Sequence, residues 1–174
     1  MKPKEDQKIL LHKILKDGTD KTLEKVEVLE KILHHLRFEG KASLGKSLKE
    51  AREVQSFFAK DLARHIPFEE GTVFPFFKTH VPRVEPMIWL LQEEHQDLNI
   101  YLKTFKSGLD ELSKVKEERE RIRILDKLLI TGNYLIYLLR YHLRTEKKYL
   151  YRIVDRELKE NEKKKLAILL RGVN

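Results

Sequence analysis

The 174-residue sequence contains no cysteine. This absence excludes a disulfide framework, thiolate-bound iron–sulfur clusters, zinc ribbons and thiol nucleophiles, so any metal must be held by histidine, carboxylate or tyrosine side chains. Glycine and proline are scarce, at seven and five residues. The amino terminus is charged and has no apolar stretch that fits a signal peptide or a membrane span. We therefore expect a cytoplasmic protein with no membrane partner.

The composition favours helices and one ordinary domain. Hydrophobic residues make up 41% and charged residues 37%, and leucine, lysine, glutamate and isoleucine dominate. The length predicts a single domain over residues 1–174. The net charge of +8 comes from Lys and Arg interleaved with Glu, as in 115–122. Because such interleaving is typical of solvated helix faces, we do not expect a nucleic-acid partner.

Hydrophobic residues at helical spacing predict four long helices with short links. Asp17-Gly18-Thr19-Asp20 is expected to end a short first helix, and Pro67 to interrupt the second long helix. These signals predict an all-α, up-down-up-down four-helix bundle with its core at about 19–157 and short extra helices at the termini. The expected helical segments are about 4–15, 19–38, from 43 to Pro67, 84–112, from 117 to beyond 154, and 160–170.

A histidine followed four residues later by a glutamate occurs twice, at His65/Glu69 and His142/Glu146, with an offset of 77 residues. On a helix the two members of such a pair lie on one face. A third histidine, His95, lies between the pairs and at a similar height in the expected bundle. Taken singly, each residue would be an ordinary surface or hydrogen-bonded helix residue. The repeated pairing instead predicts a metal site with mixed nitrogen and oxygen ligands, such as non-haem iron or manganese.

The same residues carry a resemblance to a known family, the hemerythrin-like (HHE) cation-binding domain, over about residues 19–157. The motifs that carry it are His65-x-x-x-Glu69-Glu70-x-x-Val73-Phe74-Pro75, Glu94-His95 and His142-x-x-x-Glu146-x-x-Tyr149-Leu150-Tyr151. The resemblance implies a four-helix bundle that holds a non-haem di-iron centre. By the same resemblance Glu69 and Glu146 bridge the irons, His95 and His142 bind one iron, and His65 binds the other.

One departure from the family pattern concerns the first helix, where the family usually has a histidine. The 77-residue offset places the counterpart of His95 at Gly18. Three residues remain as additional metal ligands: Asp20 or Glu24, as a carboxylate in place of the imidazole, or His12, about two turns earlier. Lys21 would instead place a positive charge at this level and leave one metal or none. The expected cofactor is thus two irons or one, with manganese and zinc also compatible.

We expect a protein that binds or senses dioxygen, nitric oxide or iron, and we favour this over an enzyme. Tyr137 and Tyr141 are expected to line a dry ligand pocket, although an ordinary core role fits each equally well. A ferritin-like oxidase is one alternative, but the Glu-x-x-His motifs of such sites are missing. A metal-free helical module that binds a partner through its basic surface is the other. A homodimer is the expected form if the chain oligomerises.

Overall fold

The chain is built from helices joined by short links. The computed structural model describes residues 3–38 and 41–171, apart from the side chains of 3–19, 41–43, 151, 155 and 171. These residues contain no strand, so the all-α prediction is confirmed. In chain order the elements are α1 (Pro3–Phe38), α2 (Lys41–Phe68), the π-helix η1 (Glu69–Val73), α3 (Phe74–His80), the 3-10 helix η2 (Pro82–Val84), α4 (Glu85–Leu112), α5 (Glu118–Arg156) and α6 (Glu160–Arg171).

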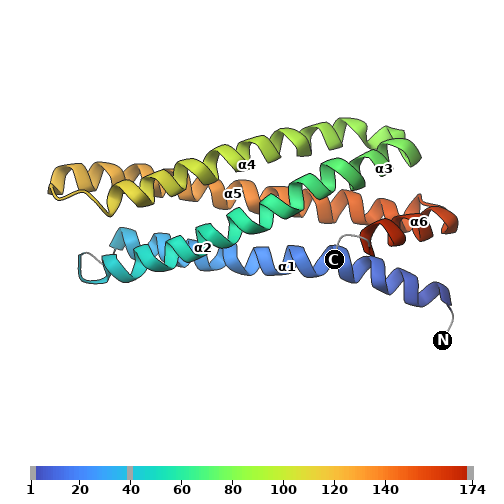
Figure 1. Cartoon of the computed structure of the whole chain (residues 1–174), viewed down its shortest axis with the longest axis horizontal. Helices are drawn as coiled ribbons and strands as arrows, with labels where there is room; N and C mark the ends of the chain where they lie inside the picture. Colours follow the sequence, from blue (N-terminus) through green and yellow to red (C-terminus); the bar gives the residue numbers. More distant parts are fainter. Residues whose placement is uncertain (1–2, 39–40, 172–174) are drawn as a thin grey trace.

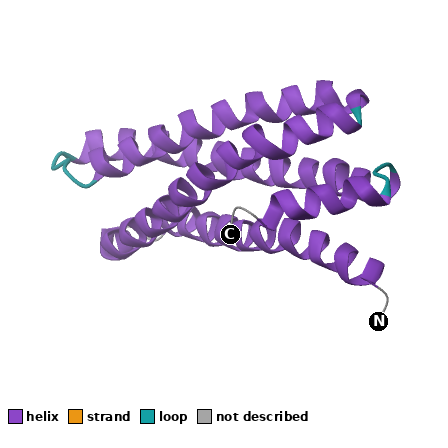
Figure 2. Ribbon diagram, turned by 45° about the vertical axis from the view of Figure 1, so that its right-hand side comes forward, coloured by secondary structure: helices purple, strands orange, loops and turns teal. Residues whose placement is uncertain are grey.

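The four long helices α1, α2, α4 and α5 lie side by side, each between two of the others. α1 contacts α2 and α5, and α4 contacts α5 and α2. In Figure 1 the carboxyl end of α1, the amino end of α2 and the α4–α5 link lie at one end of the molecule, and α3 and α6 lie at the other. Figure 2 shows that the loops within the described residues are confined to the ends of the helices. No described helix is long and apolar enough to cross a membrane.

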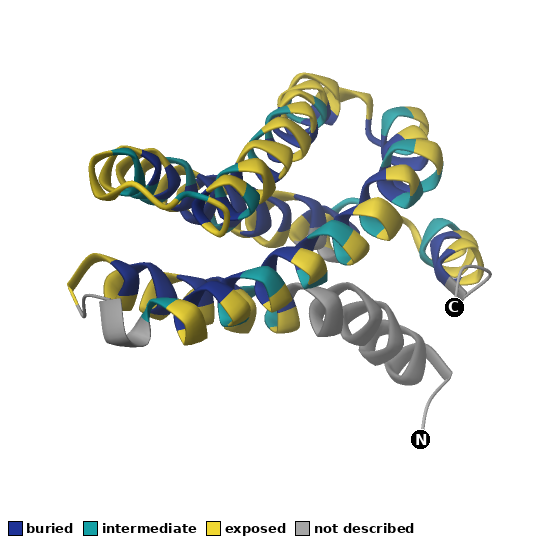
Figure 3. Ribbon diagram, turned by 60° about the vertical axis from the view of Figure 1, so that its left-hand side comes forward, coloured by how far each residue is buried: buried dark blue, intermediate teal, exposed yellow. Residues whose placement is uncertain are grey.

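Each long helix turns an apolar stripe inward, so buried residues face the axis of the molecule (Figure 3). The buried side chains form two clusters. One lies toward the α4–α5 link and includes Phe58, Phe105 and Leu135. The other lies toward α3 and α6 and includes Phe77 and Ile88. Burial of such large apolar side chains is the main favourable term that holds the helices together.

The expected break in the first helix is wrong. α1 runs without interruption from Pro3 to Phe38, through Gly18. A glycine in a helix interior costs about 1 kcal/mol relative to alanine, which a long helix with tertiary contacts can absorb. α1 contacts α6 as well as its two long neighbours. The carboxyl-terminal extra helix is confirmed, since α6 covers Glu160–Arg171.

The expected interruption at Pro67 is also wrong. α2 continues through Pro67 to Phe68, and the chain then widens into the π-turn η1 before α3 begins. The N–H of Phe74 donates to the carbonyl of Glu69, five residues earlier. Proline removes one helical hydrogen bond, and here the chain stays helical and resumes with the longer π spacing. Such π-turns are frequent at functional sites, and this one begins at a predicted ligand.

Candidate metal centre

The five side chains that the sequence analysis singled out come from four helical elements and meet inside the molecule. His65 and Glu69 come from α2 and η1, His95 from α4, and His142 and Glu146 from α5. The Nε2 atom of His65 lies 3.3 Å from Oε1 of Glu69 and 3.6 Å from Oε1 of Glu146. The Nε2 atom of His95 lies 3.3 Å from Oε2 of Glu69. Ligand atoms of His65, Glu69, His142 and Glu146 all lie within 4.8 Å of one another.

Polar atoms of this cluster are buried without hydrogen-bond partners. They are Nε2 of all three histidines, Oε2 of Glu69 and both carboxylate oxygens of Glu146. Nε2 of His142 and Oε1 of Glu146 are 2.9 Å apart, but they are not aligned for a hydrogen bond. An unpartnered buried polar atom costs about 1–3 kcal/mol, so a native protein rarely collects several of them in one place. A cation would satisfy them, and imidazole nitrogen with carboxylate oxygen suits iron, manganese or zinc.

The charges in the cluster balance when two imidazoles are protonated. Burial alone would lower the pKa of His65 and of His142, but the Glu69 and Glu146 carboxylates outweigh it. They raise the pKa of His65 to about 9 and that of His142 to about 10. Burial and the charge of Glu146 raise the pKa of Glu69. The His142 and His65 cations outweigh burial at Glu146 and hold its pKa well below the usual range. Protons thus take the place of a cation in the metal-free protein.

Two further carboxylates lie behind the histidines. Nδ1 of His95 lies 2.8 Å from Oε1 of Glu70, and Nδ1 of His142 lies 2.8 Å from Oε2 of Glu94. Glu94 is buried, whereas 38% of the Glu70 side chain is exposed. Neither carboxylate belongs to the group of converging ligand atoms.

Of the additional first-helix ligands, the two carboxylates do not join this group. Oδ1 of Asp20 lies 3.8 Å from Nζ of Lys147, and Glu24 is exposed on α1. Neither is among the converging ligand atoms. His12 lies on α1, but its side chain is outside the described residues. Lys21 is exposed, so it does not place its charge inside the bundle.

Among the described side chains of α1, residues 20–38, the buried polar one is a threonine. Thr22 is 3% exposed, and its hydroxyl donates to Oδ2 of Asp61 on α2 at 2.8 Å. Sequence reasoning missed this pair. The available signal was the position of Thr22 four residues before Val26, which continues the apolar stripe of α1 toward the amino terminus.

The expectation that Tyr137 and Tyr141 line a dry pocket is corrected by their placement. They are 62% and 45% exposed, and their rings stack on each other at 6.1 Å between centroids. Tyr134 lies 6.3 Å from Tyr137 and 4.3 Å from Tyr101, so the four rings form a row along α4 and α5. His142 directly follows Tyr141, but on a helix consecutive residues diverge by about 100° and only the histidine faces inward.

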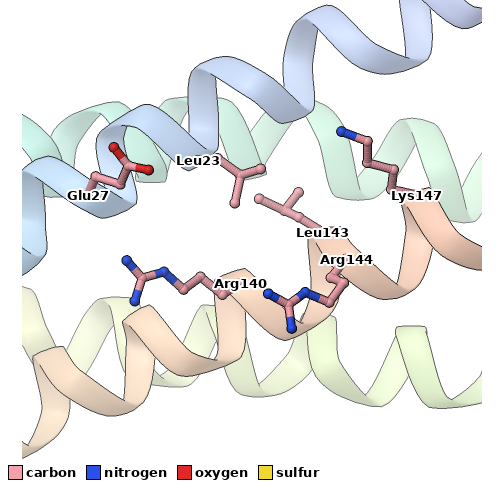
Figure 4. A pocket seen from close by; sticks show the side chains of 6 residues that line it. All are labelled: Leu23, Glu27, Arg140, Leu143, Arg144 and Lys147. Carbon is pink, nitrogen blue, oxygen red and sulfur yellow. The ribbon is translucent and has the colours of Figure 1, made fainter.

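A separate hollow of about 320 Å³ lies between α1 and α5 (Figure 4). None of its lining residues belongs to the buried cluster, although two of them directly follow cluster members in sequence. The lining combines basic side chains with two leucines and one glutamate: Leu23, Glu27, Arg140, Leu143, Arg144 and Lys147. Arg140 is held by Glu30 at 3.0 and 2.7 Å, so its charge is already paired across the two helices.

Comparison with known proteins agrees with this geometry. The family model described as the hemerythrin HHE cation binding domain matches residues 11–154. No curated protein and no solved structure matches the chain. The matched residues contain every member of the buried cluster, the whole of α2 and α4, and all of α1 and α5 except residues 3–10 and 155–156. The resemblance drawn from the sequence is thereby confirmed: the chain belongs to the hemerythrin HHE cation-binding domain family.

Proposed function

We propose that this protein binds non-haem iron between α2, α4 and α5. The proposed ligands are His65, Glu69, His95, His142 and Glu146. The observation that carries the proposal is the convergence of ligand atoms from His65, Glu69, His142 and Glu146, whose buried polar atoms lack hydrogen-bond partners. The unpartnered Nε2 of His95 adjoins this group, 3.3 Å from Oε2 of Glu69. A membership in a cation-binding family agrees with it. Two irons, which Glu69 and Glu146 would bridge, are the preferred occupancy. One iron is the alternative, because no histidine among the described side chains of α1, residues 20–38, joins the cluster.

The residues around the cluster protect it and leave one side open. On each ligand-bearing segment, the ligands lie in sequence between a member of one apolar cluster and a member of the other, so the metal would lie between two dry cores. The pairs are Leu62 and Val73, Leu98 and Leu91, and Leu139 and Leu150. His95 and His142 are 1% exposed, whereas 29% of the His65 side chain is exposed. A small molecule would therefore reach the centre beside His65. An apolar shell around a metal site limits the access of water and influences the redox potential of the metal.

A ferrous ion in such a site supplies reversible binding of a small diatomic molecule, and we propose dioxygen or nitric oxide as the ligand. The role is binding or sensing in the cytoplasm rather than catalysis. We also propose that the helices form an up-down-up-down four-helix bundle. This is supported by the long helices, each of which runs opposite to the one before it in Figure 1.

Visible absorption of the iron-loaded protein tests the proposed ligand. We expect a charge-transfer band that appears when dioxygen or nitric oxide is admitted to the anaerobic ferrous protein, and that is lost in His142→Ala. The exposed His34 on α1 provides a matched control, and His34→Ala should keep the band. Iron bound in full amount with no new band in either gas would contradict a diatomic-binding role.

A further inference from the structure

His95 and His142, the two buried histidines, each contact a carboxylate on the side of the ring that faces away from the cluster. Nδ1 of His95 lies 2.8 Å from a Glu70 oxygen, and Nδ1 of His142 lies 2.8 Å from a Glu94 oxygen. In both rings the opposite nitrogen, Nε2, is the buried atom that has no hydrogen-bond partner. Each imidazole therefore has a carboxylate behind it and the cluster in front of it.

This arrangement decides which ring nitrogen carries the proton. An ionised carboxylate only accepts hydrogen bonds, so Nδ1 of His95 and of His142 must be the donor. When the ring is neutral, the lone pair then lies on Nε2, which is the nitrogen that faces the cluster. A metal needs this tautomer, and a ring free to rotate or to hold its proton on Nε2 would bind it less well.

Two consecutive residues of the π-turn contact the two nitrogens of one imidazole, that of His95. Oε2 of Glu69 lies 3.3 Å from Nε2 of His95, while Oε1 of Glu70 lies 2.8 Å from Nδ1 of the same ring. Consecutive residues of an α-helix diverge by about 100°, and the wider turn of η1 reduces this angle. Phe74, the residue after η1, stacks on the His95 ring with 5.7 Å between centroids and 11° between planes.

The contacts also link the ligand-bearing helices in sequence. Glu70 follows the ligand Glu69 and holds His95 of α4, while Glu94 precedes His95 and holds His142 of α5. Each carboxylate thus adjoins one proposed ligand in the chain and orients the next one across a helix interface. The two contacts differ in setting, because Glu94 is 7% exposed and the Glu70 side chain is 38% exposed. Water competes less at Glu94, so its contact is the stronger one.

We propose that Glu70 and Glu94 are positioning residues that fix the ring orientation and the Nδ1–H tautomer of His95 and His142 for metal binding, with Glu94 the more important of the two. This inference rests on the proposed metal-binding function. It predicts that the loss of either carboxylate weakens metal binding although neither touches the metal.

Metal affinity of matched variants tests the proposal. Zn²⁺ and anaerobic Fe²⁺ affinities would be measured by competition with a chelator for the wild type, Glu94→Leu, Glu94→Gln and Glu70→Leu. We expect Glu94→Leu to lose about 10–100-fold in affinity and Glu70→Leu to lose less. Glu94→Gln, whose amide oxygen still accepts, should recover part of the loss. Glu93→Leu is the control, because Glu93 is exposed and adjacent on the same helix.

Long-range ¹H–¹⁵N spectra of the zinc-loaded protein give a readout that a general loss of stability would not produce. In the wild type, His95 and His142 should both show a protonated Nδ1 and a metal-bound Nε2. In Glu94→Leu the His142 Nδ1 proton should exchange rapidly with water, while His95 stays unchanged. In Glu70→Leu the His95 Nδ1 proton should exchange rapidly with water, while His142 stays unchanged.

The outcomes separate the two proposals. Wild-type protein that folds but binds neither metal overturns the proposed function and the positioning role with it. Wild-type binding together with undiminished affinity and an unchanged His142 signal in folded Glu94→Leu overturns the positioning role alone. If Glu94→Leu does not fold, Glu70→Leu replaces it as the test, because the Glu70 side chain is partly exposed. Undiminished affinity and an unchanged His95 signal in folded Glu70→Leu would then overturn the positioning role.

Discussion

Metal affinity should rise steeply with pH, because protons and metal compete for the same nitrogens. The pKa of His65 is raised to about 9 and that of His142 to about 10 in the metal-free protein. At neutral pH both rings therefore carry an extra proton. A metal ligand must be deprotonated, so binding has to release the proton from each Nε2. Because both pKa values are raised, this release costs free energy throughout the range below about pH 9.

The size of the effect follows from the number of protons displaced. Below about pH 9 two protons leave, so the apparent affinity should rise about 100-fold per pH unit, or about 10⁴-fold from pH 6 to pH 8. Between about pH 9 and 10 only His142 still holds its proton and the slope falls to about tenfold per unit. In His65→Ala one proton fewer is displaced, so the slope below pH 9 should fall to about tenfold per unit.

Chelator competition with Zn²⁺ at pH 6, 7 and 8, corrected for protonation of the chelator, measures this slope. Titration calorimetry in buffers of different ionisation enthalpy counts the released protons independently. An affinity that stays constant over this range, with no proton released, would refute the claim that these imidazoles lie in a shared cluster with the carboxylates.

Three further predictions concern stability. In the metal-free protein the pKa values of His65 and His142 are raised, so their protonation stabilises the fold fully below about pH 6.5 and this stabilisation is lost as the pH rises through 9 to 10. The melting temperature of the metal-free protein should therefore fall as the pH rises from about 6.5 to about 10. A melting temperature that stays constant over this interval would contradict the charges assigned to the cluster. Gly132→Ala should lower the free energy of unfolding in urea by about 1 kcal/mol, since the new Cβ would lie 2.7 Å from a Leu33 methyl. Gly45→Ala has open space around it and should raise the free energy of unfolding by up to about 1 kcal/mol. A Gly132→Ala variant that is more stable than Gly45→Ala would contradict the close packing at Gly132. Thr22→Val removes the hydroxyl that serves Asp61 and should cost about 1–3 kcal/mol, and no change in the unfolding midpoint would show that this hydrogen bond contributes nothing.

The long helices could be predicted because their apolar spacing persists over many turns. The third long helix is predicted at 84–112 and the fourth from 117 to beyond 154, and they are observed at Glu85–Leu112 and Glu118–Arg156. Gly18 and Pro67 misled the prediction because each is a local breaking signal of limited cost. Contacts with other helices, which the sequence does not display, decide whether the chain breaks at such a residue.

The five proposed ligands could be singled out because the same His-x-x-x-Glu spacing occurs twice in one register. The residues that contact or surround these ligands were harder to predict. On an ordinary α-helix Glu70 would point about 100° away from Glu69, and the π-turn that reduces this angle has no clear sequence signal. Thr22 lies on an apolar stripe, and its burial depends on Asp61 across the helix interface. Tyr137 and Tyr141 could not be assigned to the surface without knowing which face of α5 meets α4.

Metal content per chain tests the central claim most directly. Protein expressed with iron supplied would be compared with His142→Ala and with the control His34→Ala, with folding checked by circular dichroism. We predict one or two irons per chain in the wild type and in the control, and their loss in His142→Ala. A folded wild-type protein that contains no metal, or a His142→Ala variant that keeps its full content, would contradict a metal centre built on this cluster.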